Sequence, residues 1–149
     1  MSIYLILKHA HSGIRWILLI LLIFAVFNTI GKLLSRGKFT KGLRILAVMT
    51  MSFAHIQLLL GAALYFISPK VKFDSSGISS AAPRFYTLTH PAFMLIAIVL
   101  LTIGYMQAKR AKYDQVRLSR LFIFYLIALI LILIAIPWPW RAFGSGGWY

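Results

Sequence analysis

The sequence predicts an all-α fold, a four-helix transmembrane bundle, from its apolar runs, its composition and the placement of its charges. Four apolar runs are separated by three short polar breaks, and about 20 helical residues cross a hydrocarbon core of ~30 Å. The chain has 149 residues, of which 61% are hydrophobic. A soluble domain could not cover these runs, so we expect one transmembrane domain over residues 1–149. The runs are Trp16–Ile30, Ile45–Ser68, Phe85–Met106 and Leu121–Trp138.

The four helices are expected at residues 8–34, 43–68, 84–108 and 118–137. The first apolar run alone gives only about 22 Å, so part of the polar segment 8–15 must lie in the outer part of the span, against protein. This run does not resemble a cleavable signal, because Ile30-Gly31-Lys32 is not a small-x-small cleavage site. The third helix starts either at Pro91 or near Arg84 with a kink at the proline.

The fourth helix is expected to end at Pro137, because proline cannot continue a helix. The following tryptophans, Trp138 and Trp140, suit the membrane–water interface. The connection between the second and third helices, residues 69–83, is rich in serine and is expected to be a flexible turn-rich loop. Residues 144–149 are expected to form a loose tail.

Basic residues predict the orientation in the membrane. The first and third polar breaks together hold ten of the sixteen Lys and Arg residues, and the side rich in these residues is normally cytoplasmic. We therefore expect a multi-pass protein of the bacterial inner membrane with both termini on the periplasmic side. The ten residues are Lys32, Arg36, Lys38, Lys41, Arg44, Lys109, Arg110, Lys112, Arg117 and Arg120.

Composition excludes several classes of function. The chain has no cysteine, which excludes disulfides, thiolate metal sites and a quinone-linked disulfide oxidase. The only acidic residues, Asp74 and Asp114, lie in loops, which excludes a carboxylate pair, a His–carboxylate triad and a diiron carboxylate site within the membrane. The net charge of +14 is explained by anionic lipid headgroups beside the loops rather than by nucleic acid.

Histidines are the remaining candidates for chemistry, and the chain has four: His9, His11, His55 and His90. An ionisable residue inside a membrane span is costly and suggests a functional site. We expect each imidazole to point into the bundle or to an interface, because a lipid-facing ring would be unsatisfied. The structural alternatives are a solvated interfacial stretch for the first two, a hydrogen-bonded core residue for His55 and a helix-terminus residue for His90.

Depth along the helices predicts which histidines meet. His11 lies 21 residues from Lys32, about 31 Å of helix, and His90 lies 19 residues from Lys109, about 28 Å. Both are thus expected near the outer face at similar heights. His55 is 11 residues, about 16 Å, from the basic break before its helix and is expected near mid-membrane.

Helical spacing limits how the histidines combine. His9 and His11 are two positions apart and point about 200° apart, so they cannot both ligate one metal from a regular helix. His55 shares a face with Met51 and Phe66, which suits a flat apolar ligand. The small residues Gly61 and Ala62, on the same helix, allow a bulky group to approach the backbone.

Haem b is the cofactor that these residues suit best. Two neutral imidazoles from facing helices can hold its iron, with apolar walls and with cations near the propionates. A zinc or copper site fits less well, because it needs three ligands at one height. The cations expected on the outer side are Lys8, Arg15, Lys70 and Arg84.

Several segments resemble a family of small bacterial four-helix membrane proteins that is usually described as cytochrome-b-like. They are residues 9–16 (HAHSGIRW), 55–71 (HIQLLLGAALYFISPKV), His90-Pro91 with 94–100 (MLIAIVL), and Ile136-Pro137-Trp138-Pro139. The resemblance covers nearly the whole chain and implies a b-type haem with histidine ligands and electron transfer in or near a respiratory chain. Members often have a glutamate just before the third-helix histidine. Thr89 stands there in this chain, so no acid or proton role is implied at that position.

We therefore expect a haem-b protein that carries electrons within the bilayer, an electron-transfer protein rather than a stand-alone catalyst. His11 and His90 are the favoured axial pair, and His55 replaces His11 if the haem sits lower. Two other classes stay open: a cofactor-free accessory subunit of a larger membrane complex, and a quinone or lipid-headgroup site that uses His55 and Gln57. Expected partners are the lipid bilayer, quinone or respiratory-complex subunits, and a second copy of the chain.

Overall fold

The computed structural model describes residues 2–141 and contains four long helices and no strand in that range. The all-α prediction is confirmed. The tail expected at 144–149 lies outside the described residues. The elements are α1 (Ile3–Leu34), α2 (Lys41–Ile67), α3 (Ser76–Ser79), α4 (Ala81–Arg84), the π-helical turn η1 (Phe85–Thr89), α5 (His90–Arg110) and α6 (Asp114–Ala135).

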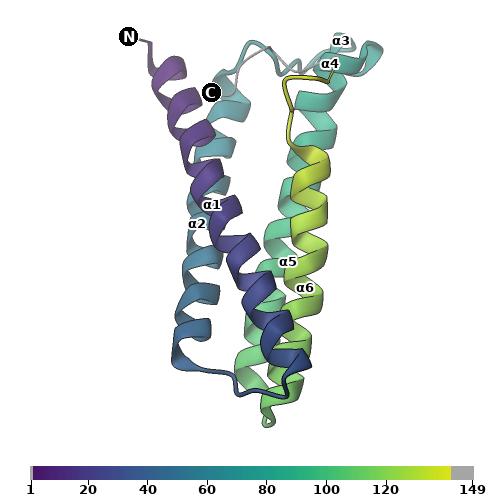
Figure 1. Ribbon diagram of the computed structural model, residues 1–149. Coiled ribbons are helices and arrows are strands. Elements are labelled where there is room, and N and C mark those ends of the chain that lie inside the picture. Colours follow the sequence, from purple (N-terminus) through teal and green to yellow (C-terminus); the bar gives the residue numbers. More distant parts are fainter. Residues whose placement is uncertain (1, 142–149) are drawn as a thin grey trace.

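The helices form two antiparallel pairs, α1 with α2 and α5 with α6 (Figure 1). The pairs contact each other through α1 against α6 and α2 against α5. We call the end where α1 begins and α6 ends the terminal end; α3 and α4 also lie there. The opposite end carries the connections at residues 35–40 and 111–113, and we call it the basic end. The two pairs diverge toward the terminal end (Figure 1).

Helix α1 begins earlier than its apolar run suggests. Its first residue is Ile3, so the polar segment 8–15 lies inside a helix of 32 residues, about 48 Å long. The Ser2 hydroxyl accepts a hydrogen bond from the Leu5 N–H at 3.4 Å and caps the start. The other end closes at Gly37, whose N–H donates to the Lys32 carbonyl at 2.8 Å.

Small residues allow the helices to approach closely. A Cβ atom built on Gly104 of α5 would lie 2.5 Å from the Cβ of Phe124 on α6, so the glycine allows these two helices to approach closely. The buried Tyr125 of α6 donates a hydrogen bond to the Ala47 carbonyl of α2 at 2.9 Å. The fully buried alanines are Ala25, Ala47, Ala54, Ala97, Ala108 and Ala128.

Large apolar side chains cover the outside of the bundle. Phe24, Leu59 and Ile96 are examples with more than half of their surface exposed. Four helical segments are long and apolar enough to cross a membrane: Ile3–Leu34, Lys41–Ile67, Ala81–Arg110 and Asp114–Ala135. Together these observations indicate a multi-pass membrane protein whose outer surface faces lipid.

Candidate functional site

His11 of α1 and His90 of α5 lie next to each other near the terminal end of the bundle. Their ring centroids are 6.4 Å apart, and the ring planes are inclined by 73°. Both side chains are partly buried. The contact joins the two helix pairs, and it confirms the prediction from depth that these histidines lie at the same height.

A π-helical turn places His90 inside the third spanning helix rather than at its end. The His90 N–H donates to the Phe85 carbonyl, five residues earlier. Pro91 has no N–H, so the Thr87 carbonyl loses its α-helical donor. The Tyr65 hydroxyl of α2 donates to that carbonyl instead, at 3.1 Å. Of the two predicted helix starts, the one near Arg84 is confirmed and the one at Pro91 is wrong, because this turn continues the helix past the proline.

The His90 ring is oriented by the end of α6. Its Nδ1 lies 2.8 Å from the carbonyl oxygen of Ala135, one of the last helix carbonyls, which have no donor within their own helix. A carbonyl only accepts, so Nδ1 of the neutral ring carries the proton and Nε2 keeps the lone pair. Metal-binding histidines are commonly oriented in this way, with one nitrogen bonded to a carbonyl and the other available.

The His11 ring is held against the backbone of α2. A Cβ atom built on Gly61 would lie 3.2 Å from the Cε1 of His11, so the glycine makes room for the ring. One turn earlier, Gln57 donates from Nε2 to the His11 carbonyl at 2.7 Å. Within residues 2–141, His11 Nδ1 and Gln57 Oε1 are buried polar atoms without a hydrogen-bond partner. A buried polar atom of this kind needs an explanation, and a ligand at the ring is one.

His55 and His9 do not join this pair. His55 is exposed on the outer face of α2, and its Nδ1 lies 2.8 Å from the Met51 carbonyl of its own helix. His9 is also exposed. Of the two expected places for each imidazole, the bundle interior or an interface, His9 and His55 thus do not take the first, and the second stays a prediction for them. Gln57 of the same helix is buried, whereas His55 faces outward, so the two side chains of the expected quinone or lipid-headgroup site lie on different faces of α2.

Gly61 of α2 has a different role from the expected one. Gly61, predicted to let a ligand of His55 approach α2, receives the His11 ring instead. Phe66, predicted to wall the same ligand, is 74% exposed. The face of α2 that carries His55 is thus an outer surface of the chain.

Phe85 lies against the histidine pair, and an aromatic contact between α1 and the end of α6 includes Trp16, which follows Arg15. The Phe85 ring lies 5.9 Å from the His90 ring, and Trp16 lies 6.3 Å from Trp138. The Arg15 guanidinium is 5.3 Å from the centre of the Trp16 ring. Arg15 is close enough to both imidazoles for its charge to act on them. Of the expected propionate partners, Arg15 is the one whose charge acts on both rings.

The remaining cations of the terminal end lie further out. The Lys70 ammonium is 3.4 Å from the Tyr86 hydroxyl and 4.7 Å from the centre of that ring. Burial lowers the pKa of Lys70, and the neighbouring charge of Lys8 acts in the same direction. Arg84 is exposed. The terminal end therefore carries the positive charges of Lys8, Lys70 and Arg84 in addition to that of Arg15.

The spacing of the rings fits two axial ligands of one metal ion. With metal–nitrogen bonds of about 2 Å on each side, two imidazoles that share an ion have centroids about 6 Å apart. The observed 6.4 Å agrees with this. Within residues 2–141, no three His, Asp or Glu side chains are grouped so that they could hold a metal ion.

The sequence did not indicate the hydrogen bonds that position His90 and His11. The Ala135 and His11 carbonyls are backbone groups that accept bonds from other helices, and no residue type identifies them. Pro91 did signal an irregular helix, but not the Tyr65 hydroxyl that compensates for it.

Comparisons of the chain with protein-family models, with curated proteins and with solved structures find no significant match.

Proposed function

We propose that this chain is a membrane protein that binds haem b through His11 and His90 and carries electrons within the bilayer. The observation that carries the proposal is the 6.4 Å spacing of the two rings, which come from different helix pairs. Haem, when bound, supplies one-electron chemistry, and the protein sets the potential through its ligands and through burial.

Three features of the chain support this function. The bond from His90 Nδ1 to Ala135 leaves Nε2 available for iron. Gly61 leaves room for the His11 ring, whose Nδ1 has no hydrogen-bond partner within the described range 2–141. Arg15 lies beside the pair and provides positive charge for propionate carboxylates.

The proposed setting is the bacterial inner membrane, with the basic end in the cytoplasm and both termini in the periplasm. The basic end holds ten of the sixteen Lys and Arg residues, and such a bias normally marks the cytoplasmic side. The histidine pair then lies near the periplasmic surface. From there, electrons pass to or from quinone or a respiratory-complex subunit, which we propose as the redox partners.

The test is the absorption spectrum and iron content of protein purified from haem-replete cells. A bis-histidine low-spin haem gives sharp bands on reduction, and we expect His90→Ala and His11→Ala each to abolish them. His9→Ala and His55→Ala are matched controls, because they remove the same side chain from exposed positions, and both should keep the bands.

A second candidate function is a cofactor-free accessory subunit of a larger membrane complex. The observation that favours it is the packing of the rings. The ring centroids of His11 and His90 are 6.4 Å apart without a cofactor, and the His11 ring packs against the backbone of α2 at Gly61. Protein without iron and without reduced bands would select this function over the first.

A further inference from the structure

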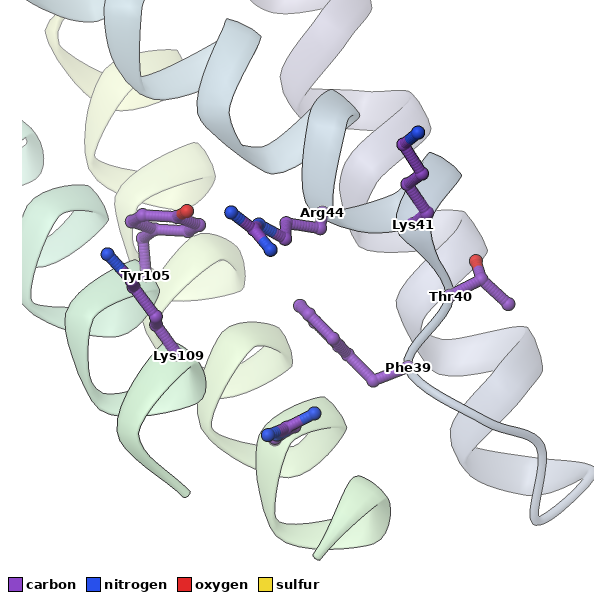
Figure 2. Close-up of a pocket in the computed structure, with 7 residues that line it drawn as sticks. Phe39, Thr40, Lys41, Arg44, Tyr105 and Lys109 are labelled. Atoms are coloured by element: carbon purple, nitrogen blue, oxygen red, sulfur yellow. The ribbon is translucent and has the colours of Figure 1, made fainter. Parts of the chain in front are cut away.

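A basic pocket lies at the other end of the bundle from the histidine pair. It has a volume of about 360 Å³, within the range of about 300–1,000 Å³ that is typical of small-molecule sites. Three elements contribute to it: the start of α2 with the connection before it, the end of α5 and the start of α6. The residues that matter here are Phe39, Lys41, Arg44, Tyr105, Lys109 and Arg117 (Figure 2).

The positive charge of this pocket is not balanced within the chain. Four of its lining residues are Lys or Arg, whereas the whole chain has two acidic residues. One of them, Asp114, pairs with Arg117 at 3.7 Å. Within residues 2–141, Lys41, Arg44 and Lys109 form no ion pair with either aspartate. Lys41, Arg44 and Lys109 thus form a cationic group that an anion from outside the chain can neutralise.

The side chains are arranged around a shared space. The Arg44 guanidinium extends from α2 toward Tyr105 of α5, and Lys109 lies beside the same tyrosine (Figure 2). Lys41 extends away from them and lies at the rim. The Arg117 guanidinium is 5.9 Å from the centre of the Phe39 ring. Arg44 and Lys109 thus lie on either side of Tyr105, with Phe39 on the Arg44 side (Figure 2).

Hydrogen bonds between the elements hold this arrangement in place. Gln115 of α6 donates to the Gly37 carbonyl at 3.0 Å, which ties the α1–α2 connection to α6. Arg120 of α6 donates to the Gln107 carbonyl of α5 at 3.3 Å. The Arg117 Nε donates to the Ala111 carbonyl at 2.8 Å. These bonds connect the elements that carry the pocket at the basic end, and a fixed backbone reduces the entropy lost on binding.

We propose that this pocket binds a phosphoryl group through Arg44, Lys109 and the Tyr105 hydroxyl. A guanidinium presents two parallel N–H donors to phosphate oxygens, and an ammonium adds a compact point charge. The pocket lies where the spanning helices end, at the height of lipid headgroups. The phosphoryl group thus comes either from an anionic phospholipid or from a soluble phosphate compound. The proposal does not depend on the haem.

Titration of the purified, detergent-solubilised protein with two probes tests this site. The probes are short-chain phosphatidylglycerol and inorganic phosphate, and the readout is the dissociation constant from calorimetry. We expect Arg44→Gln and Lys109→Gln each to weaken binding by about tenfold or more, because each removes a charged hydrogen bond. Arg110 and Lys38 are exposed residues of the basic end, as Arg44 and Lys109 are, but they do not line the pocket. The matched controls Arg110→Gln and Lys38→Gln should therefore stay within about twofold.

The outcomes separate the two sources. Binding of phosphatidylglycerol alone identifies a lipid headgroup, and binding of inorganic phosphate identifies a soluble ligand. If neither probe binds the unmodified protein, or if the controls weaken binding as much as the pocket variants, the proposal is wrong. Tyr105→Phe, which removes only a hydroxyl, provides the same comparison if Arg44→Gln does not fold.

Discussion

Replacing Gly104 by alanine tests the packing of α5 against α6. The added Cβ would lie 2.5 Å from Phe124 Cβ and 3.1 Å from Phe124 Cγ, whereas carbon atoms normally approach to about 3.5–4.0 Å. The Cβ of Phe124 cannot move away by rotation of the side chain. The two helices must therefore separate by about 1 Å, the difference between these distances.

The expected cost follows from this separation. Overpacking of a core typically costs about 1–3 kcal/mol, and alanine recovers at most about 1 kcal/mol through its higher helix propensity. We expect a net loss of about 1–2 kcal/mol, which lowers the melting temperature of a chain of this size by about 2–8 °C. Helical circular dichroism of the protein in detergent measures the change.

Gly31→Ala is the matched control, because a Cβ at this helical position meets no atom within 4 Å. It should melt at or slightly above the temperature of the unmodified protein. If Gly104→Ala melts no lower than Gly31→Ala, then α5 and α6 do not approach each other as closely as the Gly104–Phe124 contact requires.

Three further predictions concern the bundle, the site and the orientation. Tyr125→Phe removes the buried hydrogen bond to the Ala47 carbonyl and should cost about 1 kcal/mol in the same melting experiment, whereas Tyr113→Phe at an exposed position should cost nothing measurable. Gly61→Ala places a Cβ 3.2 Å from the His11 ring and should displace the ring by a few tenths of an ångström, seen as a shifted haem band with little loss of helix; an unshifted band contradicts the contact. A reporter fused after Tyr149 should be active only if it works in the periplasm, and cytoplasmic activity would invert the orientation.

The four helices and the height of the histidines are predictable because both depend on distance along the chain. Apolar length sets each span, and a helix rises by a constant amount per residue. Residue counting alone therefore pairs His11 with His90. The start of α1 at Ile3 is harder to predict, because the polar segment 8–15 interrupts the apolar pattern while staying helical.

The direction of each side chain around its helix is not predictable in the same way. In a soluble helix, the apolar stripe marks the buried face, but in lipid both faces are apolar. His55 has apolar neighbours on its own face, yet that face is exposed, and Gln57, two residues later, is a buried polar residue of α2. Counting residues fixes the height of His55, but no residue pattern indicates the direction of its side chain.

The most direct test of the central claim identifies the two axial ligands of the bound haem. The near-infrared magnetic circular dichroism band of the oxidised protein depends on both ligands, so His11→Met and His90→Met should each convert a bis-histidine signal into a histidine–methionine signal. His55→Met should leave the bis-histidine signal unchanged. A protein without haem, or a signal that neither His11→Met nor His90→Met changes, would contradict the assignment of these two histidines as the ligands.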